Sequence, residues 1–268
     1  MIEWYQSVTL GLTQGLTEFI PVSSSGHLEV VQQVLGGRTP DFHLFLEFIN
    51  LGTLLALLIF YRKRIQQILV DIFKNHNVKL ALNVIITTIP AVIAGILLSD
   101  LIESNWFFSN MVVIACAMML IGIAMLAIDR LPKMSKLKDE NHLTKPRALL
   151  IGLAQCVALI PGTSRSGSTI VAGRLTGMNS KSAADYSFLC SIPIMFGVMV
   201  KSLISSSSRE YIAANLPMLA LANVVAFGIG LAAIYFVMYY LRKKNSLRAF
   251  GIYRIVLALI IIVFELIK

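Results

Sequence analysis

Two stretches decide the fold: residues 11–27 read GLTQGLTEFIPVSSSGH, and residues 152–168 read GLAQCVALIPGTSRSGS. Each is an apolar run that stops at a proline and continues into serine and glycine. The apolar run at residues 149–160 would span only ~18 Å as a helix at ~1.5 Å per residue, short of the ~30 Å of hydrocarbon in a bilayer. A break inside a membrane is tolerated only where protein or a wet cavity surrounds it. Residues 2–35 and 148–178 are therefore predicted to be re-entrant helical hairpins with tips near mid-membrane.

The composition also places the rest of the chain in a membrane. Of 268 residues, 57% are hydrophobic and 14% are charged, with a mean hydropathy of +0.78. Soluble domains carry roughly 25% charged residues. We therefore predict a single all-α integral membrane domain, residues 1–268. Stretches long enough to cross a bilayer predict six transmembrane helices, at about 44–61, 80–98, 110–128, 185–204, 217–241 and 250–267.

The net charge of +9 is predicted to set topology rather than to bind nucleic acid. Basic residues follow the first, third and fifth spans, at 62–64, in the linker at about 129–147, and at 242–244. The linker at 99–110 contains no Lys or Arg. Because cytoplasmic loops are enriched in Lys and Arg, the linker at 129–147 is predicted to be cytoplasmic and both termini to lie outside.

The two broken stretches resemble each other, which predicts an inverted-topology repeat of about 1–130 and 147–268. Each copy holds one hairpin and three spans, and because three is odd the second copy is inverted. A second similarity lies between residues 88–95 and residues 191–197, which each contain Ile-Pro followed by a glycine. With one-residue gaps allowed, the matched positions are Gly11, Leu12, Gln14, Ile20, Pro21, Ser24 and Gly26 against Gly152, Leu153, Gln155, Ile160, Pro161, Ser164 and Gly167.

The first tip carries side chains suited to chemistry. A carboxylate at membrane depth is costly and usually marks a function, so Glu18 is a candidate catalytic residue and metal ligand; the alternative is a structural Arg–Glu clamp. Gln14 shares its helix face, because positions i and i+4 are neighbours. His27 follows a Ser-Ser-Ser-Gly turn and is a candidate acid or base. The other candidate binding positions of this tip are Ser23, Ser24, Ser25 and Gly26.

The second tip is predicted to bind an anion. Its small and hydroxyl residues let backbone N–H groups converge on a ligand, and the helix that follows points its positive end at the tip. Arg165 adds a planar fork of donors that suits phosphate oxygens. The candidate binding positions around it are Thr163, Ser164, Ser166, Gly167 and Thr169.

Together the tips offer an anion clamp, a nucleophile or base, and an acid, which is the equipment of phosphoryl transfer. A site inside the bilayer is expected when the phosphate is attached to a lipid. Glu18 also suits a divalent ion that bridges to phosphate. The chain has no GxxxxGK[ST] loop, so nucleotide-driven transport is not expected.

The paired motifs, with Gln14, Glu18 and residues 21–27 in the first and residues 161–169 in the second, resemble those of the undecaprenyl-diphosphate phosphatases, the bacitracin-resistance family. The resemblance implies hydrolysis of undecaprenyl diphosphate to the monophosphate and inorganic phosphate. It further implies Mg²⁺ or Ca²⁺, a polyprenyl diphosphate substrate, a bacterial inner membrane and a site open to the outer face. By position it makes Glu18, His27 and Arg165 the essential trio, with Ser24 beside them.

The resemblance leaves the attacking group open between Ser24, His27 and an activated water. Many members of the family have Glu where this chain has Gln14, which weakens a two-carboxylate metal site. Many also have an acid at the position of Leu46, whereas here the acid is Glu47. That shift rotates the acid by about 100° around a helix. Glu47 and Asn50 are predicted to lie near the site.

Two other functions compete with this prediction. An acid-phosphatase-like lipid phosphatase would have a His six residues and an acid ten residues after Arg165, but those positions are Val171 and Leu175. An inverted repeat with intramembrane Glu and Arg also suits a transporter or flippase of a lipid phosphate. The expected partners are the lipid substrate and membrane lipid, and a homodimer is compatible with the sequence.

The remaining chemistry-bearing residues are assigned to packing or solvent. The three cysteines lie in apolar runs and are predicted to be small buried side chains rather than redox or metal groups; they are Cys116, Cys156 and Cys190. The other histidines lie in loops or near helix ends and are predicted to be solvated; they are His43, His76 and His142.

Overall fold

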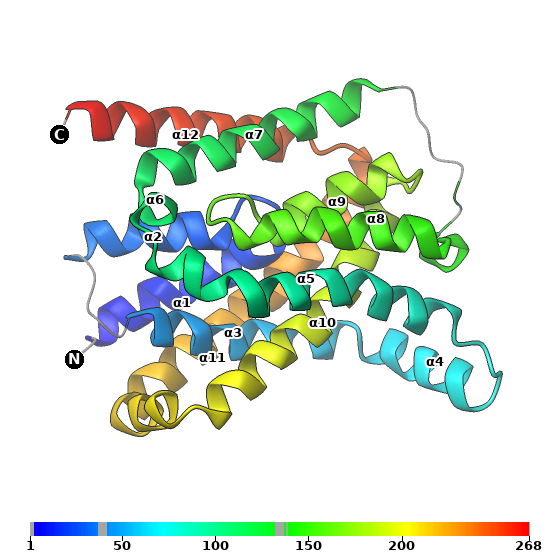
Figure 1. Cartoon of the computed structure of the whole chain (residues 1–268), viewed down its shortest axis with the longest axis horizontal. Helices are drawn as coiled ribbons and strands as arrows, with labels where there is room; N and C mark the ends of the chain where they lie inside the picture. Colours follow the sequence, from blue (N-terminus) through cyan, green and yellow to red (C-terminus); the bar gives the residue numbers. More distant parts are fainter. Residues whose placement is uncertain (1–2, 37–41, 132–136, 138, 268) are drawn as a thin grey trace.

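The computed structural model describes residues 3–36, 42–131, 137 and 139–267, and all regular structure within them is helical. Among the described residues, six helices are long and apolar enough to cross a membrane, which confirms the predicted count and class. Their bounds match the predicted spans, except for earlier starts at Ser180 and Ser206 and a later end at Ser104. They are α3 (Phe42–Phe60), α5 (Lys79–Ser104), α7 (Met111–Arg130), α10 (Ser180–Ile204), α11 (Ser206–Lys244) and α12 (Arg248–Ile267) (Figure 1).

The ends of the long helices follow the local sequence. The side chain of Asn110 accepts hydrogen bonds from the N–H groups of Val112 and Val113, which caps the start of α7. At the C-terminal end of α11, three basic residues precede Asn245, which takes the left-handed conformation with φ 46°. This combination of cations in the last turn and a left-handed residue beyond it is typical of helix C-termini.

The fifth span differs from its prediction at the N-terminal end. It was predicted to begin at residue 217, where the apolar run starts, but α11 begins at Ser206. Ser205 caps this added polar segment by accepting a hydrogen bond from the N–H of Ser208. Asn215 has non-helical φ/ψ two residues before Pro217, and sharp kinks in long helices usually accompany a proline.

Two helix–turn–helix hairpins occupy the stretches predicted to be broken. The first is α1 (Trp4–Phe19) with α2 (Ser24–Val34), and the second is α8 (Lys145–Cys156) with α9 (Arg165–Leu175), joined through the 3₁₀ turn η2 (Val157–Leu159). The longest of these helices, α1, has 16 residues, or ~24 Å at ~1.5 Å per residue. None of the four is therefore long enough to cross ~30 Å of hydrocarbon.

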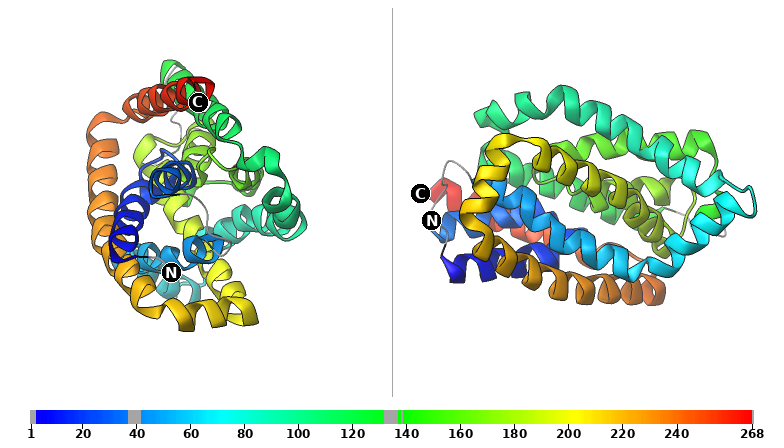
Figure 2. Two further views of the ribbon diagram at one scale, coloured as in Figure 1. Left: turned by 90° about the vertical axis from the view of Figure 1, so that its left-hand side faces the viewer. Right: turned by 90° about the horizontal axis from the view of Figure 1, so that it is seen from below.

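The two turns lie next to each other in the middle of the molecule (Figure 1), and the long helices surround them. Seen end-on, α11 and α12 form one wall and the hairpins lie inside it (Figure 2). α1 packs closely on α11: a Cβ on Gly11 would stand 2.6 Å from the carbonyl oxygen of Ala222, and one on Gly15 would stand 2.8 Å from that of Ala226. Glycine is required where helix backbones approach this closely.

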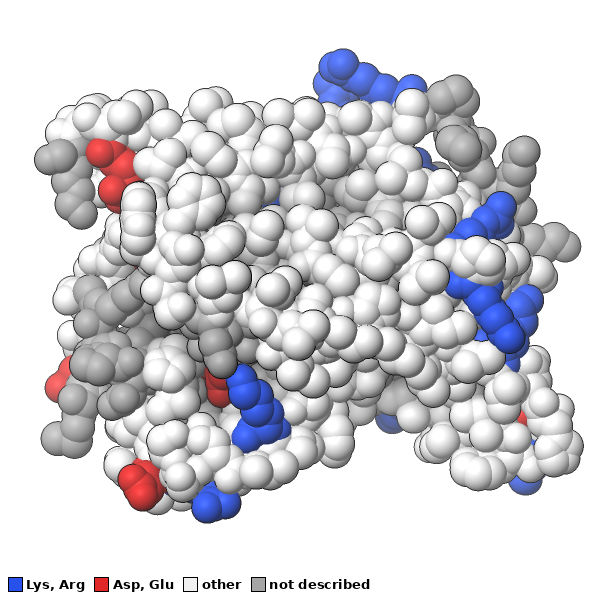
Figure 3. All heavy atoms as spheres, in the orientation of Figure 1, with Lys and Arg blue, Asp and Glu red and all other residues white. Residues whose placement is uncertain are grey.

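Three short helical segments complete the part of the chain that the structure describes. α4 (Arg62–Phe73) continues beyond α3, α6 (Trp106–Ser109) joins α5 to α7, and the 3₁₀ turn η1 (Glu140–His142) precedes α8. Arg64 of α4 pairs with Glu140 of η1 at 2.6 Å. Lys and Arg gather mainly at this end of the molecule (Figure 3). That asymmetry agrees with the charge pattern used to predict the topology.

The packing and solvent predictions hold with one exception. Cys190 is buried and Cys156 is half-buried, but Cys116 is exposed on the apolar surface of α7. Its prediction as a buried side chain was wrong, because an apolar position on a membrane helix can face lipid as readily as protein. His43, His76 and His142 are exposed as predicted, and Nδ1 of His142 lies 2.7 Å from Asp139.

Candidate active site

The two tips share one backbone construction. Ser23 and Ser164 each precede a helix with a left-handed φ, 81° and 71°, which few residues other than glycine adopt. The Ser23 hydroxyl accepts a hydrogen bond from the N–H of Gly26 at 3.3 Å, and the Ser164 hydroxyl accepts one from that of Gly167 at 3.1 Å. The structure thus pairs Ser23, rather than the predicted Ser24, with Ser164. With the correct pairing, Ser24 occupies the position of Arg165.

α7 holds both tips from the same side. A Cβ on Gly26 would lie 2.9 Å from the sulfur of Met118, and one on Gly167 would lie 3.1 Å from Cε of Met125. These methionines are seven residues apart and therefore lie on one helix face. Gly162, with φ 93°, is tighter still, because its Cβ would lie 2.3 Å from the carbonyl oxygen of Ile114. Small residues at these positions let the turns approach α7.

Glu18 is the centre of a network that joins the tips. Its carboxylate pairs with the Arg165 guanidinium and accepts a hydrogen bond from the Ser24 hydroxyl at 2.7 Å. The amide of Gln14 donates to the same carboxylate at 3.1 Å and to the side-chain oxygen of Asn50 at 2.8 Å. The predicted residues Glu18, Ser24, Arg165 and Gln14 are therefore in direct contact, and Asn50 joins them.

Further contacts fasten one tip to the other. The N–H of Gly162 donates to the Ser25 hydroxyl at 3.3 Å, and the Ser166 hydroxyl lies 3.5 Å from the backbone oxygen of Glu18. The starts of α2 and α9 are thereby brought together. Helix N-termini bear a partial positive charge and attract anions, so this meeting point is electrostatically suited to phosphate.

The Arg165 guanidinium is only partly used. One terminal nitrogen binds Glu18, while Nε is buried and has no hydrogen-bond partner among the described residues. A buried donor without an acceptor is costly, and an arginine fork usually engages an oxyanion through two donors. The free Nε is the donor expected to meet a phosphate oxygen.

His27 belongs to a separate pair. Its Nδ1 lies 2.7 Å from the Ser23 carbonyl oxygen, which can only accept, so Nδ1 carries the hydrogen. Its Nε2 lies 2.7 Å from the Tyr253 hydroxyl, and the two rings are stacked with an interplanar angle of 6°. No hydrogen bond joins His27 to Glu18 or Ser24 in the described part of the chain. Nε2 is therefore the ring nitrogen that could exchange a proton with a ligand, and in this structure its partner is the Tyr253 hydroxyl.

Arg254, next in sequence, is a residue that the sequence analysis missed. Its side chain is fully buried and donates to backbone oxygens of both tips: Pro21 at 3.3 Å, Gly162 at 2.7 Å and Thr163 at 3.0 Å. It also donates to the carbonyl of Met118 on α7 at 3.0 Å. The signal was present, because an arginine inside a predicted span meets the same test of charge at membrane depth that singled out Arg165.

The comparisons with known proteins agree with these motifs. Residues 7–260 match the family described as bacitracin resistance protein BacA. The chain belongs to this family. It is 37% identical to undecaprenyl-diphosphatase 1 of Clostridioides difficile, covering 98% of this chain and 97% of the relative. It is 37% identical to an undecaprenyl-diphosphatase of Caulobacter, covering 97% of each chain, and 35% identical to one of Fusobacterium nucleatum, covering 96% of this chain and 98% of the relative.

In this member of the family, Glu47 lies outside the network. Its carboxylate accepts a hydrogen bond from the Ser202 hydroxyl of α10, and no hydrogen bond to the tips is present among the described residues. The predicted placement of Glu47 in the site was wrong, whereas that of Asn50 agrees with its bond to Gln14. The two are three positions apart on α3, so their side chains are only about 60° apart around the helix. Asn50 nevertheless bonds to Gln14 of α1, whereas Glu47 bonds to Ser202 of α10.

Several predicted binding residues serve the turn itself. The Thr163 hydroxyl donates to the carbonyls of Val157 and Ile160. Thr169 bonds to the Arg165 carbonyl at 2.8 Å and to the Ser187 hydroxyl at 2.6 Å. These bonds shape the second tip and anchor it to α10. Their predicted contact with the substrate stays a prediction.

The residues present could hold a divalent ion only together with the substrate, whose phosphate oxygens would supply the remaining ligands. Glu18 is the single carboxylate bonded within the network, and no cluster of three or more His, Cys, Asp or Glu is found in the described residues. Mg²⁺ in phosphate-transferring sites is commonly held by one or two carboxylates plus phosphate oxygens and water. Glu18 with Gln14 meets that requirement at its lower limit.

Proposed function

We propose that the chain hydrolyses undecaprenyl diphosphate to undecaprenyl phosphate and inorganic phosphate, as the names of its relatives indicate for them. The predicted enzyme class agrees with those names and with the family. The alternative of a lipid-phosphate transporter is not favoured by them. The observation that carries the proposal is the contact of Ser24, Glu18 and Arg165 across two helix starts.

The terminal phosphate is bound between the tips. Arg165 contributes its free Nε, and the starts of α2 and α9 contribute backbone N–H groups. These donors stabilise charge on the phosphoryl oxygens as the bond to the leaving group lengthens. The polyprenyl tail stays in the bilayer, which explains why the phosphate site lies among apolar helices.

Ser24 is the best-placed nucleophile. Its hydroxyl donates to Glu18 at 2.7 Å, which is the arrangement of a nucleophile with its base. The Ser24 oxygen attacks the terminal phosphorus, its proton passes to Glu18, and the bond to the bridging oxygen breaks to release undecaprenyl phosphate. Glu18 releases this proton to solvent, and water then attacks the phosphorus of the phosphoserine and gives a proton to Glu18. The bond from phosphorus to the Ser24 oxygen breaks, that oxygen takes the proton back from Glu18, and inorganic phosphate leaves. A direct attack by water with Glu18 as base is the alternative.

His27 is proposed as the proton carrier at the other side of the site. Only its Nε2 is available, because Nδ1 donates to the Ser23 carbonyl. Together with the Tyr253 hydroxyl, Nε2 can exchange a proton with an oxygen of the leaving phosphate. Gln14 and Asn50 hold the Glu18 carboxylate in place.

A divalent ion, Mg²⁺ or Ca²⁺, is proposed to enter with the diphosphate and to be held by Glu18, with Gln14 beside it. Its charge would offset that of the diphosphate oxygens. Arg165, which already pairs with Glu18, disfavours a cation bound before the substrate arrives.

The membrane arrangement is part of the proposal. α1–α2 and α8–α9 are re-entrant hairpins of two inverted repeats, about 1–130 and 147–268, in the bacterial inner membrane. Helices too short to span, the shared serine turns and the basic end of the molecule support it. The termini lie outside, the linker at 129–147 is cytoplasmic, and the site opens outward. A homodimer stays a prediction.

The test is phosphate release by the purified chain in detergent, with long and short prenyl diphosphates. The proposal predicts equal amounts of inorganic phosphate and prenyl monophosphate. A protein that only transports lipid phosphate would release neither, and that result would overturn the proposal. Acid quenching during turnover, followed by mass spectrometry of the peptide with Ser24, separates a phosphoserine intermediate from direct attack by water.

A further inference from the structure

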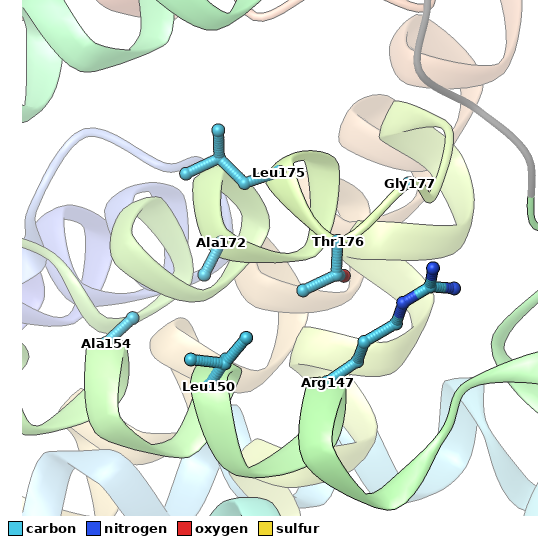
Figure 4. Close-up of a pocket in the computed structure, with 7 residues that line it drawn as sticks. All are labelled: Arg147, Leu150, Ala154, Ala172, Leu175, Thr176 and Gly177. Atoms are coloured by element: carbon cyan, nitrogen blue, oxygen red, sulfur yellow. The ribbon is translucent and has the colours of Figure 1, made fainter.

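A second groove lies between α8 and α9, at the ends of these helices away from the tips. Its volume is about 450 Å³, and it is lined by Arg147, Leu150, Ala154, Ala172, Leu175, Thr176 and Gly177. The side chains of Leu150 and Ala154 on α8 face those of Ala172 and Thr176 on α9, and Arg147 extends along the rim below Gly177 (Figure 4). None of these residues takes part in the network around Glu18.

The groove is apolar along its length and positive at one end. Leu150 and Leu175 are 57% and 52% exposed, so the apolar part opens to the surface that faces the bilayer. The Arg147 side chain has no hydrogen bond or ion pair within the described residues. The acids of the neighbouring turn η1 are already occupied: Glu140 pairs with Arg64, and Asp139 lies 2.7 Å from His142.

We propose that this groove binds an anionic phospholipid of the surrounding bilayer, with an acyl chain between α8 and α9 and its phosphate on Arg147. Basic pockets between membrane helices at a basic face are where anionic headgroups bind. A zwitterionic lipid such as phosphatidylcholine also carries a phosphate, but its ammonium group offsets the attraction to the guanidinium, so a lipid of net negative charge is favoured. An arginine fork is suited to phosphate oxygens.

The bound lipid would join the two arms of the second hairpin. α9 begins at Arg165 and ends beside the groove at Leu175, so one helix carries both the catalytic arginine and the lipid contact. Occupancy would therefore stabilise the hairpin that positions Arg165, at a distance from the reacting atoms. This inference does not depend on the proposed reaction, because lipid binding can be measured without turnover.

The test uses the full chain in detergent, with phosphatidylglycerol or phosphatidylcholine of matched acyl chains added and bound lipid counted by native mass spectrometry. Wild type is expected to prefer phosphatidylglycerol. Arg147→Gln is expected to lose about fivefold in affinity for it, the effect of one surface cation, with phosphatidylcholine unchanged. Arg147→Lys should keep the preference, because it keeps the charge.

Two matched variants complete the test. Arg248→Gln removes an exposed cation from the start of α12, and should leave binding unchanged. Ala154→Trp fills the apolar part, and should lower retention of both lipids. Equal retention of the two lipids by wild type, or full phosphatidylglycerol retention by Arg147→Gln, would overturn the proposal. A dimer that Ala154→Trp dissociates would also overturn it, because a second copy would then occupy the groove. Glu18→Gln should retain lipid, which separates this outcome from failure of the proposed reaction.

Discussion

The two tips have the same backbone and different chemistry. In each, a left-handed serine caps a helix and a glycine three residues later donates to its hydroxyl. At the next position the first tip has Ser24 and the second has Arg165. The first tip also carries Glu18, where the corresponding stretch of the second is apolar. One construction therefore presents a nucleophile and base from one side and an anion clamp from the other.

This difference explains why neither hairpin could work alone. The carboxylate of the first tip is satisfied by the arginine of the second, and the arginine has one donor left over. An unpaired charge among apolar helices is costly, so the ion pair stabilises the meeting of the tips before substrate arrives.

The largest effect is expected for the Ser24 hydroxyl of the first tip, with the Ser166 hydroxyl of the second tip as its control. Ser24→Ala should lower kcat at least about 10³-fold, because it removes the proposed nucleophile. Ser166→Ala, in the first turn of α9, should lower kcat less than about tenfold, because that hydroxyl makes only long contacts. The measurement is phosphate release by purified variants. Equal losses of kcat in the two variants would contradict the assignment of the nucleophile to the first tip and of anion binding to the second.

Removal of divalent ions comes next in size. A chelator should lower phosphate release about 10²-fold or more, and Mg²⁺ should restore it. Binding of Mn²⁺, followed by its electron paramagnetic resonance signal, should strengthen when a non-hydrolysable diphosphate is added, because Glu18 alone holds the ion weakly. Tight binding of the ion without the diphosphate would contradict the assignment of the metal to the substrate.

Arg254 donates hydrogen bonds to both tips, so its loss should affect the stability of the two together. Arg254→Met should lower the free energy of unfolding by on the order of 3 kcal/mol, since it leaves buried carbonyls of both turns without donors. The measurement is the thermal unfolding midpoint in detergent. Arg248→Gln, an exposed arginine at the start of the same helix, should not shift it. An unchanged midpoint in Arg254→Met would show that the tips hold together without α12.

The smallest effect is expected at Tyr253, which touches the first tip only. Tyr253→Phe keeps the ring stacked on His27 and removes one hydrogen bond, so kcat should fall by about two- to tenfold with KM unchanged. Tyr235→Phe on α11 removes a hydroxyl away from the site, and should leave kcat unchanged. A loss confined to KM would place Tyr253 in substrate binding instead of in positioning His27.

Much of this arrangement could be predicted because it depends on local patterns. The six spans follow from apolar length, and the turns at residues 21–23 and 161–164 follow from proline, serine and glycine. Glu18 and Arg165 could be singled out because charge is rare in such surroundings. These signals are contained in single stretches of sequence.

What could not be predicted depends on how helices rotate and pack. Glu47 and Asn50 differ by three positions on one helix, and only the packing of α3 shows that Asn50 faces Gln14. The bond of His27 to Tyr253 joins residues 226 positions apart, which no local pattern contains. Arg254 could have been found by the rule applied to Arg165, but its four carbonyl partners could not.

The most direct test of the central claim concerns Arg165, the charge that the second tip brings to the first. Phosphate release and the binding of a non-hydrolysable prenyl diphosphonate should be measured together for wild type and Arg165→Lys. Lysine keeps the charge and loses the fork, so release should fall at least about 10²-fold and diphosphonate binding should weaken, while the protein stays monodisperse. Wild-type release and binding in Arg165→Lys would contradict a diphosphate site formed between the two tips.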